Sequence, residues 1–237
     1  MRHGRMTKIL VGLLAAGLAA SPAMAQSTAA DKSAGPLAPR DECTGLPGYA
    51  EFRERLDRAI TLRDADALIA LTDPDVTLDF GGGSGVGELR QRLDNGAYNS
   101  WADLAGAVQL GCGVGEDDAR DPDHIAFPWY FPKTFGGEVY ETAIVTGADV
   151  PLRVAPADDA QVLKRIGWDW VLIRYDEQYQ DGPEEAEDAP SRYSAVTTQD
   201  GAAGYIADHA LRSIVDYRIA VNRVDGAWTI TAFVAGD

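Results

Sequence analysis

Two things are scarce in this sequence: long apolar runs and basic charge. The apolar stretch Ile9–Ala20 is well short of the about 20 residues that a transmembrane helix needs. Lys and Arg together number 21 against 37 Asp and Glu, which gives a net charge of -16. Because such a surface repels phosphate backbones and anionic lipids, the composition argues against nucleic acid and against membrane surfaces as partners.

The first residues have the pattern of a secretory signal peptide. Arg2, Arg5 and Lys8 precede the apolar run, and the segment ends in an A-x-A motif at Ala25. A basic region, an apolar region and a small-residue cleavage site in this order are typical of export signals. We therefore expect a signal peptide over residues 1–25, a periplasmic or secreted mature protein, and no membrane insertion after signal cleavage.

Cysteine is also scarce, with Cys43 and Cys112 as the only two in the chain. An even pair in an exported protein predicts a disulfide bond, because export places the thiols in an oxidising compartment. A bond between them would close a loop of about 70 residues and stabilise the fold by about 4 kcal/mol in the chain-entropy model.

The mature chain divides into a leader, a helix-rich part and a strand-rich part. Residues 26–42 are rich in Ala, Ser and Pro without an apolar period, which predicts a flexible leader. Residues 43–135 are expected to form a small helix-rich α+β domain. Its predicted elements are a helix at Phe52–Ile60, a short helix capped by Asp64 or Asp66, a strand at Val76–Phe80, and helices that start near Glu88 and Trp101.

The aromatic segment Phe127–Pro132 contains two prolines, so we interpret it as a packed linker between the two halves. From residue 139 onward the pattern is one of short strands separated by turns, which favours a small all-β barrel or sandwich. Two last strands flank a turn at Asp225-Gly226 and predict a terminal hairpin. The predicted domain, residues 139–237, includes this hairpin, although packing against the first domain is an alternative.

Two family resemblances follow from these segments. The opening of the first domain, with two helices, an aspartate before the second helix and then a strand, resembles the start of an NTF2-like cone. Residues 145–212 resemble a bacterial SH3 (SH3b) domain. The matching pieces are Leu152-Arg153-x-x-Pro156, Ala160-x-Val162-Leu163, Tyr193-x-x-Val196, Asp200-Gly201-x-x-Gly204-Tyr205-Ile206 and Leu211-Arg212.

The SH3b resemblance implies a small barrel with a non-catalytic binding role, often toward cell-wall peptide or glycan. Small barrels bind extended peptides in aromatic-lined grooves, so the candidate groove residues are Trp168, Trp170, Tyr193 and Tyr205. The alternative for these aromatic residues is the barrel core. Two features depart from the family: Tyr193 stands where many members have tryptophan, and the acidic loop 176–191 is longer than usual.

Motifs for nucleotide binding and serine catalysis are incomplete. The glycine-rich turn Gly81–Gly87 does not match G-x-G-x-x-G, and Glu88 stands where a phosphate-binding loop has lysine. The string around Ser84 lacks the last glycine of G-x-S-x-G. We therefore expect no cofactor and no enzymatic activity of these kinds.

A cysteine peptidase of the cell wall is the enzyme alternative. SH3b domains often accompany NlpC/P60 peptidases, and the string at Asp41–Leu46 distantly resembles their nucleophile motif, with His124 as the partner base. Glu42 interrupts the string, Pro47 and Gly48 break the helix that would carry the nucleophile, and Cys112 offers a disulfide partner.

Acidic side chains gather in two segments, residues 116–124 and 176–188. Neither has the D-x-D-x-D-G loop with a terminal glutamate that binds calcium. We therefore expect solvated loops and no metal.

The sequence predicts an α+β N-terminal domain plus an all-β SH3b-like small barrel with an added C-terminal hairpin. The expected function is non-catalytic binding of peptidoglycan or of an envelope protein, and a periplasmic accessory that binds another protein without wall binding is the alternative.

Overall fold

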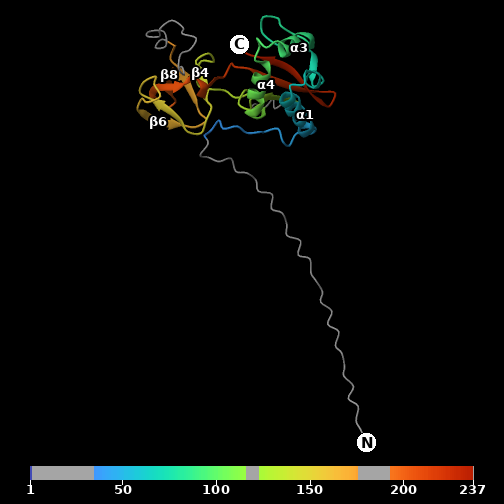
Figure 1. Cartoon of the computed structure of the whole chain (residues 1–237), viewed down its shortest axis with the longest axis horizontal. Coiled ribbons are helices and arrows are strands. Elements are labelled where there is room, and N and C mark those ends of the chain that lie inside the picture. The colour runs from blue at the N-terminus through green and yellow to red at the C-terminus, as the bar shows by residue number, and fades with distance from the viewer. Residues whose placement is uncertain (2–34, 116–122, 176–192, 237) are drawn as a thin grey trace.

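The computed structural model describes residues 1, 35–115, 123–175 and 193–236. The predicted signal peptide beyond Met1, the predicted leader as far as residue 34 and most of both acidic segments lie outside the described residues. In the described part of the chain, two lobes lie side by side, one containing four α-helices and a sheet, the other built mainly from strands (Figure 1). The expected mixture of helices and mostly antiparallel sheet is confirmed. In the ranges given above, no helix is long and apolar enough to cross a membrane.

The helices of the first lobe begin close to the predicted positions. They are α1 (Tyr49–Leu62), α2 (Ala65–Ile69), α3 (Val86–Asp94) and α4 (Ser100–Gln109). The side chain of Asp64 accepts a hydrogen bond from the Ala67 amide at 3.0 Å and caps α2, one of the two caps that the sequence allows.

The first sheet has five strands in the order β1-β12-β11-β3-β2. Its strands are β1 (Thr72–Thr77), β2 (Gly113–Val114), β3 (His124–Phe127), β11 (Arg218–Val224) and β12 (Ala227–Val234). Strand β1 lies earlier than the predicted Val76–Phe80, because it pairs in parallel with β12 from Thr72 onward. Pro74 is compatible with this position, because β1 is an edge strand of the sheet. Proline lacks a backbone N–H, and an edge strand tolerates that loss because one of its sides has no neighbouring strand.

The terminal hairpin belongs to the first sheet by its strand pairing. Strands β11 and β12 pair with each other across the turn at Asp225 and Gly226, whose φ angles are 52° and 83°. Strand β11 also pairs with β3, and β12 with β1. The sequence-based boundary grouped this hairpin with the second domain, residues 139–237. In the structure the hairpin instead packs against the first lobe, which was the alternative. The physical reason is the apolar face of the hairpin, which packs with the helices in one core.

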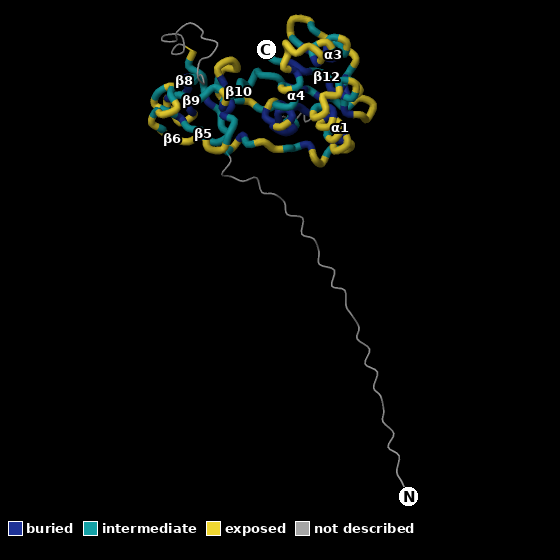
Figure 2. The backbone as a smooth tube through the Cα atoms, in the orientation of Figure 1, coloured by how far each residue is buried: buried dark blue, intermediate teal, exposed yellow. Residues whose placement is uncertain are grey.

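That core is made by buried residues of the helices and of the sheet, and buried stretches of the first lobe are dark blue in Figure 2. Its buried side chains include Phe52, Leu56, Leu68, Leu104, Ile125, Phe127, Ile219, Val221, Trp228, Ile230 and Phe233. The indole N–H of Trp228 donates to the Pro47 carbonyl at 3.0 Å, which joins the last strand to the start of α1.

The second sheet has seven strands in the order β10-β4-β7-β8-β9-β5-β6. They are β4 (Thr142–Val145), β5 (Val150–Arg153), β6 (Val162–Ile166), β7 (Trp170–Ile173), β8 (Tyr193–Thr198), β9 (Ala203–Ala207) and β10 (Leu211–Ser213), with a 3-10 turn, η1 (Asp208–Ala210), before β10. A separate core of Val145, Leu152, Val171, Val196 and Ile206 lies on its inner face.

A third apolar cluster joins the two lobes. Trp129 and Tyr130, both 2% exposed, follow β3 directly and pack with Leu37, Leu110 and Ile144. Of the predicted packed linker, Trp129 and Tyr130 lie buried at the joint, whereas Phe127 is the last residue of β3 and packs in the core of the first lobe.

Residues 35–46, which we call the strap, run along the edge of this joint from the second lobe to the first (Figure 1). At one end the Leu37 amide donates to the Trp168 carbonyl at 2.7 Å, and at the other the Glu42 amide donates to the Cys112 carbonyl at 2.8 Å. Between them the Arg40 guanidinium stacks 3.5 Å from the centre of the Trp129 ring.

Candidate binding surface

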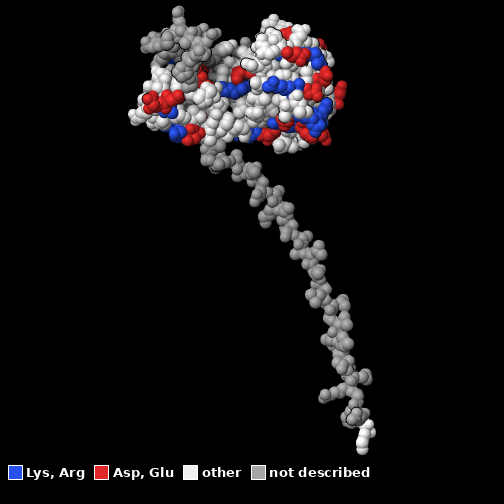
Figure 3. Space-filling view, viewed as in Figure 1, with Lys and Arg blue, Asp and Glu red and all other residues white. Residues whose placement is uncertain are grey.

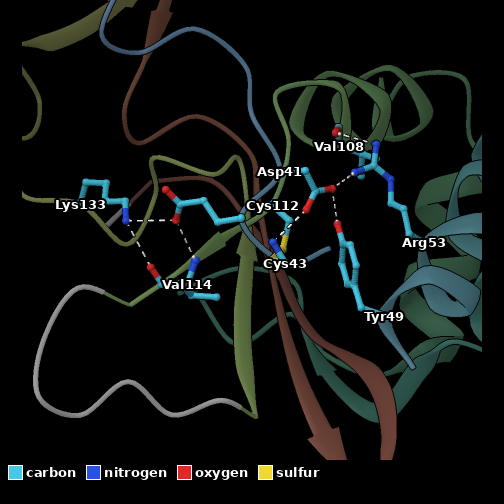
Figure 4. Close-up of a disulfide and its surroundings, with 9 residues drawn as sticks. Asp41, Cys43, Tyr49, Arg53, Val108, Cys112, Val114 and Lys133 are labelled. Carbon is cyan, nitrogen blue, oxygen red and sulfur yellow. Dashed lines mark hydrogen bonds and ion pairs between the residues drawn. A yellow bond between two sulfur atoms is a disulfide. The ribbon is translucent and has the colours of Figure 1, made fainter. Parts of the chain in front are cut away.

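The predicted disulfide between Cys43 and Cys112 is present, with the two Cα atoms 5.8 Å apart and both side chains buried. Figure 4 shows Asp41 beside it, with its carboxylate directed toward Tyr49 and Arg53. The Asp41 carboxylate accepts hydrogen bonds from the Tyr49 hydroxyl at 2.6 Å and from the Cys43 amide at 3.0 Å, and it pairs with Arg53 at 3.2 Å. Burial, followed by the hydrogen bond to Asp41, raises the pKa of Tyr49.

This arrangement leaves no thiolate at the position of the hypothetical nucleophile, because Cys43 is bonded to Cys112. His124 lies on β3, where its Nδ1 is 2.5 Å from the side-chain oxygen of Asn222 on the neighbouring strand. The cysteine–histidine chemistry of a peptidase requires a free sulfur. The oxidised structure therefore does not contain that catalytic arrangement at Cys43.

Among the described residues, Asp41, Cys43 and Cys112 are the only three potential metal ligands that lie together. Two of them are disulfide sulfurs, which lack the thiolate that binds metal. The third, Asp41, already holds the partners given above. The disulfide and the contacts of Asp41 hold the strap to the first lobe, and the group does not have the composition of a metal centre.

The four aromatic residues of the candidate groove fall into two pairs. Trp168 and Trp170 are partly buried and pack against the cluster at the joint between the lobes. Neither belongs to the separate core around Val171. Their contacts show a role in connecting the lobes.

Tyr193 and Tyr205 share one face of the second sheet. Ala195 lies opposite Tyr205, and Tyr193 lies opposite Ala207, so the alternation of side chains puts both tyrosines on the same side. Arg153 of β5 lies opposite Tyr205 on its other flank. We call Arg153, Tyr193 and Tyr205 the tyrosine face.

The tyrosine face carries opposite charges close to its aromatic rings. The Tyr193 hydroxyl donates to Asp158 at 2.5 Å, and this hydrogen bond raises the pKa of Tyr193. The Arg153 guanidinium donates to the Ala160 carbonyl at 2.8 Å. A partly exposed aromatic surface with one fixed carboxylate and one fixed guanidinium has the donors, acceptors and apolar area that bind extended peptides or sugars.

A cleft of about 200 Å³ lies on the other side of β8. Its lining comes from β4, β7, β8, η1 and β10 and from the segments beside them, namely Tyr140, Thr142, Ala143, Ile173, Tyr175, Ser194, Asp208, Leu211 and Ser213. We call it the Asp208 cleft. Sequence reasoning missed it, because its members come from five separate stretches and no spacing rule connects them.

Two further hollows are found in the described part of the chain. The larger, about 410 Å³, is a groove between α1 and α4 that includes Ile60, Trp101 and Val108. The smaller, about 150 Å³, lies at the joint beside Tyr130 and Phe135. On the face shown in Figure 3, basic and acidic side chains are interspersed over the first lobe, so this face carries no continuous track of one charge.

No family model matches this chain, and no curated protein matches it.

Proposed function

We propose that this protein is exported and acts as a non-catalytic binding protein, whose SH3b-like second lobe engages peptide or glycan of the cell wall. The observation that carries the proposal is the distribution of the SH3b-like motif residues. Arg153 ends β5, Val162 starts β6, Tyr193 and Val196 lie on β8, and Gly204–Ile206 lie on β9. Each piece of the resemblance thus falls on its own strand of one sheet.

The close packing at Gly204 supports this correspondence. A Cβ atom on Gly204 would lie 2.6 Å from the Arg153 carbonyl oxygen and 2.9 Å from the Leu152 side chain. Glycine is therefore required where β9 crosses β5, which gives a physical reason for the glycine of the D-G-x-x-G pattern.

The binding half of the proposal is tested by incubating the mature protein with purified peptidoglycan at low salt and sedimenting the wall. We expect retention of the protein, and a clear loss of it in a Tyr193→Ala/Tyr205→Ala double variant. Tyr98→Ala is the matched control, because Tyr98 is a 49% exposed tyrosine on the first lobe. Absence of retention, with specific co-purification of an envelope protein instead, would replace wall binding by the protein-binding accessory role.

The export half is tested by expressing the full chain in a bacterial host and determining the mass of the recovered protein. Cleavage after Ala25 should give a mature chain that starts at Gln26 and is found in the periplasmic fraction. An uncleaved chain that stays in the cytoplasm would contradict export. The buried disulfide supports an oxidising compartment, because such bonds are rare in reducing cytosol.

A further inference from the structure

The Asp208 cleft has one charged lining residue, and that residue is acidic. Neither Lys nor Arg is among the residues that line it. An anionic ligand would therefore meet an uncompensated negative charge at short range. The lining selects for a ligand that is neutral or positively charged.

The carboxylate of Asp208 is held in place with half of its acceptor capacity unused. Its Oδ1 accepts a hydrogen bond from the Ser194 hydroxyl at 2.6 Å. Its Oδ2 has no hydrogen bond from any residue that the structure describes, although the side chain is half-buried. A carboxylate accepts through both oxygens, so a donor from a ligand would complete this group.

Two tyrosines form the rim of the cleft. Tyr140 and Tyr175 are 57% and 44% exposed, so a ligand in the cleft can reach both rings from solvent. The Tyr175 hydroxyl donates to the Tyr140 carbonyl at 2.7 Å and so connects the two sides of the rim. Aromatic faces attract cations, most strongly where water is partly excluded.

A divalent metal does not suit this lining. Calcium takes six to eight oxygen ligands and usually several carboxylates, whereas the cleft offers one carboxylate with hydroxyl groups around it. An organic cation needs fewer ligands, and its carbon chain can contact the apolar walls at Ala143 and Ile173.

We propose that the Asp208 cleft binds a primary ammonium group at the end of a short aliphatic chain, as on a lysine-type side chain of a peptide. The ammonium donates to Asp208 Oδ2, the methylenes contact Ala143 and Ile173, and the tyrosine rim encloses the chain. This inference rests on the second lobe being the binding part of the protein. It specifies the chemical class of one ligand, and it gives the second lobe a second binding site besides the tyrosine face.

The first test titrates the isotope-labelled mature protein with Nα-acetyl-lysine amide and follows amide shifts by NMR. We expect shifts at Tyr140, Ser194 and Asp208, and binding that is weaker by about tenfold or more when the side-chain amine is acetylated. Asp208→Asn should weaken binding to the same extent. Asp149→Asn, which removes an exposed carboxylate of the same lobe, is the matched control and should leave the titration unchanged.

Tyr140→Leu provides a second variant that keeps an apolar rim but removes the aromatic ring, and it should also weaken binding. Equal shifts with the acetylated and free amines would overturn the proposal. So would wild-type affinity in Asp208→Asn with the fold intact.

A second test separates this inference from the function proposed above. Purified peptidoglycan is used before and after acetylation of its free amines. Retention that falls on acetylation and in Asp208→Asn supports the inference. Retention unchanged by both keeps wall binding but overturns the role of the cleft. Where neither wall preparation retains the protein, wall binding is overturned, and the lysine-amide titration decides the inference alone.

Discussion

At the scale of single residues, the joint between the lobes contains a polar atom that burial has isolated. The Tyr130 hydroxyl has no hydrogen-bond partner within the described residues. Burial raises the pKa of Tyr130 to about 12, and the nearby Arg212 guanidinium partly opposes that rise through its charge and through its donor groups, which lie close to the hydroxyl without meeting hydrogen-bond geometry. The ring itself packs fully in the cluster at the joint. The ring and the hydroxyl therefore make opposite contributions to stability.

Replacing Tyr130 by phenylalanine is expected to leave the free energy of unfolding unchanged or to raise it by about 1 kcal/mol, because the variant removes an unpaired buried hydroxyl. Tyr130→Ala should lower it by about 3–5 kcal/mol through loss of the ring. Urea unfolding measures both. A loss of more than about 1 kcal/mol in Tyr130→Phe would show that the hydroxyl is bonded in solution.

Asp200 makes the turn between β8 and β9 sensitive to acid. Its hydrogen bonds with Lys164 and then Thr198 lower the pKa of this carboxyl to about 2, from about 3.9 in an unfolded chain. Because the folded pKa lies below the unfolded one, the stabilisation is complete above the unfolded value and is lost as pH falls toward 2.

Asp200→Asn should therefore destabilise the protein at pH 7, and the difference from wild type should shrink between about pH 4 and pH 2. Urea unfolding at several pH values measures this difference. The same substitution in a Lys164→Met background should cost less at neutral pH, because Lys164 is the main partner of the carboxylate. A difference that stays constant with pH would contradict the predicted titration.

At the scale of elements, the strap depends on a glycine beneath it. Gly111 has a φ of +90°, and a Cβ there would lie 1.9 Å from the Arg40 carbonyl oxygen. Any side chain at this position must push the strap away from the end of α4 and must adopt a left-handed backbone conformation.

Gly111→Ala should lower the free energy of unfolding by roughly 1–3 kcal/mol and speed tryptic cleavage after Arg40, which is exposed on the strap. Gly96→Ala is the matched control, since nothing lies within 4 Å of its Cβ position and its φ is ordinary; it should change stability by no more than about 0.5 kcal/mol. Equal cleavage rates in both variants would contradict close packing of the strap.

The disulfide fixes the other contact of the strap with α4. The two cysteines are 69 residues apart in the sequence, so the chain-entropy model gives a stabilisation of about 4 kcal/mol. The double variant Cys43→Ala/Cys112→Ala should lose about that amount in urea unfolding without reductant. A loss below about 1 kcal/mol would mean that the unfolded chain is little constrained by the bond.

At the scale of the whole molecule, the first lobe is discontinuous in sequence. Deleting residues 217–237 removes β11 and β12, and with them the core residues Ile219, Val221, Trp228, Ile230 and Phe233. Hydrogen exchange in α1 and α4 should then become fast, while peptides from β8 and β9 keep their protection. Retained protection of α1 and α4 would contradict the assignment of the hairpin to the first sheet.

Local patterns in the sequence predicted the positions of helices and strands better than they predicted which strands pair with each other. Helical spacing around Leu56 and the Asp225-Gly226 turn depend on neighbouring residues, and they locate α1 and the last hairpin closely. The partner of that hairpin depends on contacts with β1 and β3, which no local pattern encodes.

The same limit applies to the candidate site. No local pattern predicts the surface that Trp168 and Trp170 meet, because Leu37, Trp129 and Tyr130 from distant segments make it. The Asp208 cleft was missed for the same reason. The disulfide was predictable because a two-cysteine chain offers a single intramolecular pairing.

The discontinuous first lobe also determines when each part of the protein can fold. A chain made or threaded from its N-terminal end presents α1 to α4 and β1 well before β12, and these elements have no finished sheet to pack on until then. The second lobe, whose strands are contiguous from β4 to β10, can close while the first remains open. Strands β11 and β12, which are made last, therefore complete the fold. The first lobe finishes its sheet only after the second lobe beside it has folded.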